Sequence, residues 1–210
     1  MGERSRLLLT GVGGQGVLTA AKILGDAVHA AGLPVVVGQL HGMSQRGGSV
    51  ECSVLIGEGA SSFITGGADL VIGFEPLETL RVLPQMGAHT RVIMNEGTIV
   101  PYAIAGAGHE YPPISEITAS LREVVREVLL FDGPRLLGQV GEGRTLNVAM
   151  IGALSGLDFL PVSSDTLWRA VARRCPERYL EANRRAFELG RDVTAPGQDR
   201  EREAGESGHG

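Results

Sequence analysis

The residues with the clearest chemical meaning form a glycine-rich stretch near the start of the 210-residue chain, Gly11-Val-Gly-Gly-Gln-Gly16. An apolar run that predicts a buried strand, Arg6–Thr10, comes before it, and a helical pattern begins at Gln15. Glycines let the backbone turn tightly and approach a ligand, while the N-terminus of a helix offers unpaired N–H groups and a partial positive charge. A loop of this kind, between a strand and a helix, is suited to holding an anion.

The same spacing satisfies the Gly-x-Gly-x-x-Gly pattern of dinucleotide sites, but a supporting residue is missing. Such a site needs Asp or Glu at the end of the second strand, about 20 residues further on, to hold the ribose. Here the segment is Val36-Val-Gly-Gln-Leu-His41, in which Gln39 can bond a hydroxyl but no carboxylate is present. No Gly-Lys-Ser/Thr follows, so the loop is not a Walker A motif. Three interpretations stay open: a nicotinamide or flavin dinucleotide site, a site for another phosphate or carboxylate, and a structural turn or subunit contact.

A second polar loop, His41-Gly-Met-Ser-Gln-Arg-Gly-Gly48, follows the predicted strand Val35–Leu40. Because the carboxyl ends of parallel strands share one edge of a sheet, we expect this loop beside the glycine-rich one. Arg46 can hold a carboxylate or phosphate through two parallel N–H donors, and His41 can change its charge near neutral pH. The structural alternative is a surface loop whose Arg and Gln side chains bond backbone carbonyls. A catalytic pair of His41 with Ser44 is disfavoured, because no acidic residue is placed to orient the histidine.

Composition argues against several classes of protein. Hydrophobic residues make up 43% of the chain and aromatics only 4%, so aliphatic side chains must fill the core. The net charge of −5 argues against a nucleic-acid partner. Cys52 and Cys175 are too few for an iron–sulfur cluster and stand in no zinc-binding pattern. No apolar run reaches the roughly 18–20 residues of a membrane span, and no signal peptide is evident. We expect a cytoplasmic protein with reduced thiols, no metal bound by this chain alone, and no membrane partner.

Strand-like and helical segments alternate along most of the chain. The predicted strands are 6–10, 35–40, 49–56, 68–73, 91–94 and 127–131. The predicted helices are 15–31, 75–86, 115–125, 145–154, 164–173 and 176–189, with Glu75 and Ser115 placed to cap two of them. This alternation predicts an α/β fold of three layers, a Rossmann-like, largely parallel twisted sheet with helices on both faces. We expect a single domain over residues 1–192 and a disordered tail over 193–210, which has little to bury.

Two motifs carry a resemblance to a known family. Gly-Val-Gly-Gly-Gln-Gly-Val (11–17), followed by His-Gly-Met-Ser-Gln-Arg-Gly-Gly-Ser-Val (41–50), is similar to the gamma-type domain of the 2-oxoacid:ferredoxin oxidoreductase family. Within that family the His-Gly-Met-x-Gln prefix looks most like the beta subunit of the indolepyruvate branch. The resemblance continues through 68–78, 147–153 and 183–190, and it therefore covers nearly everything except the tail.

The resemblance implies the small subunit of a heteromeric oxidoreductase, inactive alone. The implied reaction is oxidative decarboxylation of indolepyruvate or another aryl 2-oxoacid to the acyl-CoA, with electrons passed to ferredoxin and coenzyme A as co-substrate. Thiamine diphosphate, Mg²⁺ and iron–sulfur clusters would belong to a larger partner subunit, because this chain has neither a thiamine motif nor clustered cysteines. The alternatives are a related subunit acting on pyruvate or a branched-chain 2-oxoacid, and a Rossmann-like nucleotide-binding module.

No residue of this chain is expected to be catalytic. The residues expected to line the shared active site or bind its ligand come from the two loops: Gly11, Gly13, Gly14, Gln15, Gly16, His41, Gln45, Arg46, Gly47 and Gly48. Among them, Arg46 and the helix N-terminus at Gly16 are expected to hold an anionic part of coenzyme A or the substrate carboxylate. A structural role for Arg46 in the subunit interface is the alternative.

Overall fold

The computed structural model describes most of the chain. The described ranges are 4–41, 48–57, 67–99, 110–140 and 145–195. Three of the predicted site residues, Gln45, Arg46 and Gly47, lie outside these ranges, as does segment 196–210 of the predicted tail.

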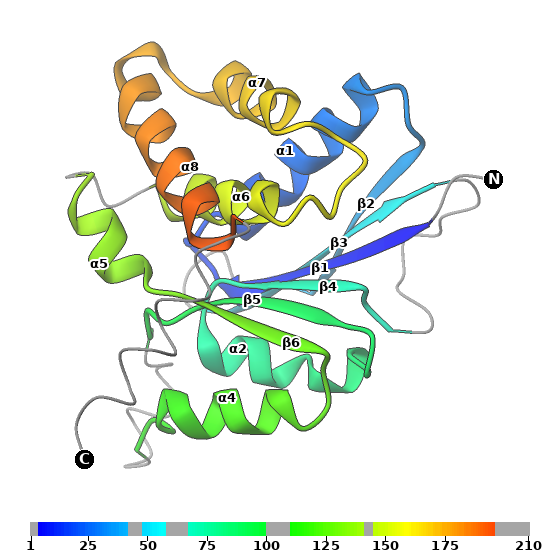
Figure 1. The fold of residues 1–210 in the computed structure, drawn as a ribbon, viewed down its shortest axis with the longest axis vertical. Helices are drawn as coiled ribbons and strands as arrows, with labels where there is room; N and C mark the ends of the chain where they lie inside the picture. Colours follow the sequence, from blue (N-terminus) through cyan, green and yellow to red (C-terminus); the bar gives the residue numbers. More distant parts are fainter. Residues whose placement is uncertain (1–3, 42–47, 58–66, 100–109, 141–144, 196–210) are drawn as a thin grey trace.

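A six-stranded sheet forms the centre of the molecule (Figure 1). In chain order its strands are β1 (Ser5–Val12), β2 (Val35–His41), β3 (Ser49–Ile56), β4 (Leu70–Gly73), β5 (Arg91–Asn95) and β6 (Glu127–Phe131). Their order across the sheet is β2-β3-β1-β4-β5-β6, and β1, β4, β5 and β6 are parallel to one another. Strand β3 runs antiparallel to both of its neighbours, so β2 and β3 form a hairpin. The predicted α/β fold with a largely parallel sheet is confirmed.

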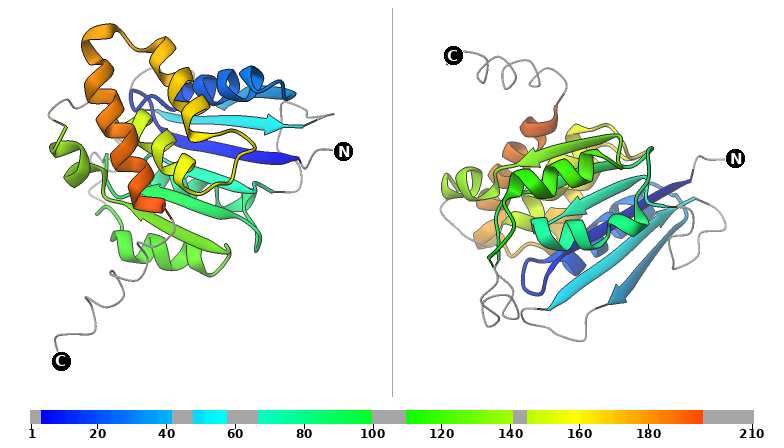
Figure 2. Two further views of the ribbon diagram at one scale, coloured as in Figure 1. Left: turned by 45° about the horizontal axis from the view of Figure 1, so that its top comes forward. Right: turned by 90° about the horizontal axis from the view of Figure 1, so that it is seen from below.

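Helices cover both faces of the sheet, which gives the three predicted layers (Figures 1 and 2). The helices on one face are α1 (Val17–Ala30), α6 (Leu146–Gly156), α7 (Ser164–Arg174) and α8 (Leu180–Thr194). The other face carries α2 (Pro76–Arg81) and α4 (Ile114–Arg122), while the short α5 (Gly133–Gly138) follows β6. Two 3₁₀ turns, η1 (Leu83–Gln85) and η2 (Glu177–Tyr179), complete the described elements. Within the described ranges, no helix combines the length and the apolar character that crossing a bilayer would take.

The sheet separates two hydrophobic cores, and β1 contributes to both. Successive side chains of a strand point to opposite faces. Leu7 and Leu9 therefore pack under α1 and α6, while Leu8 packs against the α2 and α4 side. All three leucines are fully buried. As the composition suggested, aliphatic side chains dominate both cores.

Helices α6 and α8 approach each other closely through glycines. A Cβ atom on Gly190 would fall on the Ala149 carbonyl oxygen, and one on Gly152 would fall on the Phe187 carbonyl oxygen. The absence of a side chain at both positions lets the two helix backbones touch. This contact holds α6 in place, and the first residues of α6 belong to the candidate site below.

Several element boundaries differ from the predictions. The predicted helix 75–86 is split into α2 and η1, because Pro84 lacks an N–H and would clash with the carbonyl one turn earlier. The prediction that Ser115 caps its helix is wrong: Pro113 is the N-cap, and Ser115 lies inside the first turn. That helix ends at Arg122, short of the predicted end at 125, and Val124 beyond it is 37% exposed.

Two further differences lie near the ends of elements. Helix α5 was not anticipated, although Asp132 caps it by accepting a hydrogen bond from the Arg135 N–H at 3.1 Å. Helix α8 continues to Thr194, into the first two residues of the segment expected to be the tail.

Candidate functional site

The turn from β1 to α1 has a backbone that favours glycine. Gly14 has φ +106° and Gly16 has φ +84°, conformations that other residues adopt only with strain. The turn closes through a 3.1 Å hydrogen bond from the Gln15 N–H to the Val12 carbonyl. Space is also limited at Gly16, where a Cβ would lie 3.0 Å from the Asn147 amide. The glycines at 14 and 16 therefore follow from the shape of the turn.

The Gln15 side chain folds back under this turn. Its Oε1 accepts a 2.7 Å hydrogen bond from the Val12 N–H, and its Nε2 donates at 2.8 Å to the Phe74 carbonyl. Phe74 directly follows β4, so this one amide joins the carboxyl ends of β1 and β4. Gly11 leaves the space that the amide occupies, because a Cβ there would lie 2.7 Å from Gln15 Oε1.

The second predicted loop ends beside the first. The Gly13 N–H donates to the Gly48 carbonyl at 2.8 Å, so the two loops touch through their backbones. As expected, β2 runs in the same direction as β1, since both are antiparallel to β3, so their carboxyl ends share one edge of the sheet. Strand β3 then begins where β1 ends, with Val12 opposite Ser49. The backbone of His41 ends β2 opposite Glu51, after an irregularity in the register.

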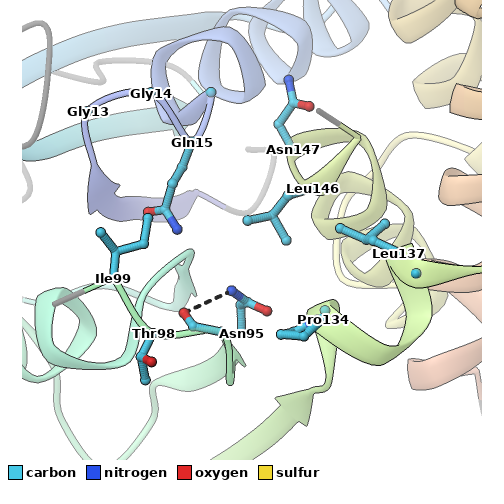
Figure 3. Close-up of a pocket in the computed structure, with 14 residues that line it drawn as sticks. Gly13, Gly14, Gln15, Asn95, Thr98, Ile99, Pro134, Leu137, Leu146 and Asn147 are labelled. Carbon is cyan, nitrogen blue, oxygen red and sulfur yellow. Dashed lines mark hydrogen bonds between the residues drawn. The ribbon is translucent and has the colours of Figure 1, made fainter. Parts of the chain in front are cut away.

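A cavity of about 860 Å³ opens at the carboxyl edge of the sheet (Figure 3). One wall is the glycine turn, residues 13–16, faced by Asn147 from the start of α6. The opposite wall comes from residues 97–99, after β5, and from α5. Four apolar side chains contribute to the lining: Ile99, Pro134, Leu137 and Leu146. A cavity of this size, with a polar and an apolar side, is typical of small-molecule sites.

Two helices begin at this cavity. The N-cap of α1 is Gly16, which has no side chain to cap the helix, and the N-cap of α6 is Thr145, whose hydroxyl makes no capping bond. Neither helix has an acidic residue in its first turn. Both helix dipoles therefore present their positive ends, with backbone N–H groups, beside the same space. The cavity is suited to a ligand with an anionic group and an apolar portion.

Two buried side chains support the wall opposite the glycine turn. Asn95, only 2% exposed, donates from Nδ2 to the Phe74 carbonyl at 2.8 Å and to the Gly97 carbonyl at 3.4 Å. Glu75 accepts hydrogen bonds from the Tyr111 hydroxyl at 2.6 Å and the Ile99 N–H at 3.3 Å. Burial, followed by the hydrogen bond and charge of Glu75, raises the pKa of Tyr111, which keeps the hydroxyl a donor.

Glu75 also caps α2, since its Oε2 accepts a 2.9 Å hydrogen bond from the Glu78 N–H. The helix-capping role predicted for this residue is therefore confirmed. The same carboxylate holds the Ile99 backbone, so the α2 side of the sheet contributes to the shape of the cavity.

The predicted residues divide into three groups. Gly13, Gly14, Gln15 and Gly16 line the cavity. Gly11 lies below the turn, packed against Gln15, and Gly48 meets Gly13 through the backbone. His41 is placed by its backbone alone, and Gln45, Arg46 and Gly47 are outside the described residues.

Sequence reasoning missed three of the residues that line the cavity. Asn95, Ile99 and Asn147 come from a strand end, the segment after it and a helix start, each distant from the glycine turn in sequence. The usable signal for Asn95 was its position, because it ends a buried parallel strand at the edge where such sheets bind ligands.

The described residues do not fit a metal centre. No three His, Cys, Asp or Glu side chains among them are grouped as metal ligands would be. Cys52 is buried on β3, while Cys175 follows α7. Chiefly through burial, the pKa of Cys52 is raised to about 11, which disfavours the thiolate that iron would bind. The described part of the chain therefore offers no group of cysteines or other such ligands for an iron–sulfur cluster.

Comparisons with known proteins agree on one family. The family model for pyruvate ferredoxin/flavodoxin oxidoreductase matches residues 6–193. The chain is 38% identical over 185 residues to indolepyruvate oxidoreductase subunit IorB of Methanothermobacter thermautotrophicus, a match that covers 88% of this chain and 94% of that one.

Two solved structures share the fold. One is the gamma subunit of a keto/oxoacid ferredoxin oxidoreductase from Geobacter sulfurreducens, with a TM-score of 0.71 and 22% identity, covering 92% of this chain and 97% of that one. The other is 2-oxoglutarate:ferredoxin oxidoreductase from Magnetococcus marinus with 2-oxoglutarate, coenzyme A and succinyl-CoA bound. It has a TM-score of 0.73 and 18% identity, and the match covers 92% of this chain but 31% of that one.

Proposed function

The chain belongs to the pyruvate ferredoxin/flavodoxin oxidoreductase family, and from that premise we propose that it is the small subunit of an indolepyruvate-type 2-oxoacid:ferredoxin oxidoreductase. The reaction is the oxidative decarboxylation of indolepyruvate, or another aryl 2-oxoacid, to the acyl-CoA with reduction of ferredoxin. The similarity to an indolepyruvate oxidoreductase subunit over 88% of the chain supports this assignment.

The observation that carries the proposal is the cavity at the carboxyl edge of the sheet. Its glycine turn and its two helix N-termini favour an anion, and both coenzyme A and a 2-oxoacid carry one. The apolar side chains at 99, 134, 137 and 146 can pack against an uncharged portion of the same ligand. The cavity would thus form one wall of an active site shared with the larger subunit.

The part of this chain in the reaction is to bind and orient. Backbone N–H groups of Gly14, Gly16 and the first turn of α1 would hold the anionic group of coenzyme A or the substrate carboxylate, because those of Gly13 and Gln15 already donate to the Gly48 and Val12 carbonyls. The apolar wall would exclude water from one side of the ligand, which strengthens the electrostatic contacts at the other. No residue of this chain is assigned a covalent or proton-transfer role.

Thiamine diphosphate with Mg²⁺, and the iron–sulfur clusters, are assigned to the larger partner subunit. When bound there, they supply the decarboxylation chemistry and the path for electrons to ferredoxin. The cysteine content of this chain supports that division, because Cys52 and Cys175 lie on separate elements. Cytoplasmic location is part of the same proposal.

Copurification and activity test the assignment. The chain is co-expressed with the large subunit of an indolepyruvate-type oxidoreductase from the same source, and the complex is assayed for ferredoxin reduction. We expect a stable brown complex that needs an aryl 2-oxoacid and coenzyme A, whereas either chain alone is inactive. A monomer that binds NAD tightly and binds no partner subunit would refute the proposal. A preference for pyruvate or a branched-chain 2-oxoacid would keep the subunit assignment and change the proposed substrate.

Arg46 provides a test at the level of one residue. In the sequence it stands two residues before Gly48, whose carbonyl accepts the Gly13 N–H. The proposal assigns its guanidinium, a fork-shaped donor, to the anionic group of the ligand. In the complex, Arg46→Ala should raise the KM for coenzyme A or for the 2-oxoacid by about tenfold or more, because a charged hydrogen bond is lost. If both KM values stay unchanged, Arg46 is a structural residue.

A further inference from the structure

The carbonyl oxygen of Phe74 accepts hydrogen bonds from two side-chain amides. Gln15 Nε2 reaches it from the β1–α1 turn, and Asn95 Nδ2 reaches it from the end of β5, each at 2.8 Å. Phe74 directly follows β4, which lies between β1 and β5 in the sheet. Its own N–H donates to the Thr10 carbonyl at 2.8 Å, so the acceptor is itself fixed to β1. Three adjacent strand ends are therefore tied to one oxygen.

Each amide has a second bond that extends toward one wall of the cavity. Gln15 Oε1 accepts a hydrogen bond from the N–H of Val12, which is the last residue before the glycine turn. Asn95 Nδ2 also bonds the Gly97 carbonyl, which belongs to the opposite wall (Figure 3). The two walls are thus connected through the Phe74 carbonyl.

The surrounding sequence makes room for this arrangement. A Cβ on Gly11 would press on Gln15 Oε1, and a Cβ on Gly133 would collide with Asn95 Oδ1. Asn95 Oδ1 is buried and has no hydrogen-bond partner among the described residues. A purely apolar side chain would avoid the cost of burying that oxygen. Both side-chain amides therefore bond backbone groups. Each does so where a residue packed against it, Gly11 or Gly133, has to be glycine to leave room.

We infer that Gln15 and Asn95 are positioning residues, which together set the distance between the glycine turn and the wall after β5 and so tune binding of the anionic ligand. The inference rests on the proposed function for the identity of that ligand. It gives Gln15 and Gly11 a role different from ligand contact: Gln15 holds the turn, and Gly11 provides its space.

The test uses the complex with the larger subunit and three variants of this chain. Gln15→Met and Asn95→Leu keep the approximate size of each side chain but remove its hydrogen bonds. Gln15→Glu keeps the acceptor for the Val12 N–H but sets a carboxylate against the Phe74 carbonyl. The matched control is Asn183→Leu, which removes an amide bonded to the Tyr179 carbonyl at 2.9 Å on α8, away from the cavity.

If the inference is right, all three variants raise the KM for coenzyme A or for the 2-oxoacid by about tenfold. The kcat at saturation should change by less than about twofold, because the loss is in uniform binding. Gln15→Met combined with Asn95→Leu should raise KM by less than the product of the single effects, since both act on one acceptor. Asn183→Leu should lower the melting temperature and leave KM unchanged.

A second measurement separates this inference from the proposed function. Hydrogen exchange of the peptide covering residues 11–17 is followed in the full chain, where Gln15→Met and Asn95→Leu should each speed exchange and Asn183→Leu should not. Unchanged exchange, unchanged KM, wild-type behaviour of Gln15→Glu, or an equal KM effect in the control would each overturn the inference. A wild-type complex that is inactive with every 2-oxoacid would instead refute the proposed function, and the exchange data would still decide whether the amides hold the turn.

Discussion

Asp69 joins two strands at the amino end of the sheet, opposite the edge that carries the cavity. Arg6 of β1 donates to its carboxylate from Nε at 3.0 Å, from a terminal nitrogen at 2.6 Å and from its backbone N–H at 2.8 Å. Burial raises the pKa of Asp69, but the hydrogen bonds and charge of Arg6, with a contribution from His89, outweigh it and hold that pKa below the usual value. The pair is partly buried, with side-chain exposures of 30% and 22%.

This geometry predicts a pH-dependent stability. A carboxylate whose pKa is lowered by folding stabilises the protein above its unfolded pKa of about 3.9 and loses that effect as the pH falls through the folded value. Asp69→Asn should therefore lower the free energy of unfolding at pH 7 by about 1–3 kcal/mol, with the difference shrinking below about pH 4. Urea unfolding of both chains at pH 7 and pH 3 measures this.

The control is Asp165→Asn, which breaks a solvent-exposed pair with Arg169 on α7. Exposed pairs contribute little, so this variant should match the wild type at both pH values. A deficit in Asp69→Asn that is equal at pH 7 and pH 3 would mean that packing, not charge, accounts for its loss.

At the scale of residues, the sequence located the glycine turn but not the other residues that line the cavity. The glycine turn was recognisable because glycine, polar residues and a following helix stand together in the chain. Asn95 and Asn147 were not, because they join the cavity only when β5 and α6 are placed beside β1. Gln15 was expected to line the shared active site or to bind its ligand, and it lines the cavity. That its amide bonds the backbone could not be predicted, because no pattern of residue types distinguishes an amide that faces a ligand from one that faces the backbone.

At the scale of elements, the contact between α6 and α8 positions one wall of the cavity. Asn147 lies in the first turn of α6, and the glycines at 152 and 190 set how closely α8 approaches. Helical periodicity predicted both helices but not this contact. From the sequence, a glycine inside a helix indicates only lower helix stability, and its role in close helix packing becomes visible only in the structure.

Substitution of one glycine should disrupt the helix pair. Gly190→Ala places a methyl group on the Ala149 carbonyl, so we expect a loss of about 1–3 kcal/mol or more in the free energy of unfolding. Gly138→Ala in α5 is the matched control, because no atom lies within 4 Å of its added Cβ. That control should be neutral or slightly stabilising, since alanine favours helix over glycine. Equal stability of the two variants in urea unfolding would show that α6 and α8 can separate at no cost.

The predictions of secondary structure were most accurate for elements that form because their side chains are buried. They were least accurate for elements whose start and end depend on local capping and turn residues. The six strands were found because short apolar runs, rich in β-branched residues and bounded by glycine or proline, are typical of buried strands. Helix α5 has six residues with glycine at both ends, too short for a periodic pattern. The direction of β3 follows from pairing with β1, which no local pattern encodes.

At the scale of the whole molecule, both helix layers contribute to one cavity. The glycine turn and Asn147 belong to the α1 and α6 layer, whereas Ile99 is held by Glu75, which caps α2 on the other face. The fold class predicted from alternation of strands and helices is confirmed, but alternation says nothing about how the two layers share a site. A cavity built across the sheet requires that both layers stay folded together.

Cooperative unfolding of the two layers is therefore the last expectation, and β1 offers a matched pair to test it. Leu8 and Leu9 are neighbours, equally buried, and point into opposite cores. Each Leu→Ala change should cost about 2–5 kcal/mol in the free energy of unfolding.

Trp168, the single tryptophan, packs against the core on the α1 side, so its fluorescence reports that layer alone. Because strands shared by both cores couple the layers, Leu8→Ala should lower the fluorescence-detected melting temperature as much as the one detected by far-UV circular dichroism. A Leu8→Ala chain in which the circular dichroism melts early while the fluorescence transition stays in place would show that the two layers unfold separately.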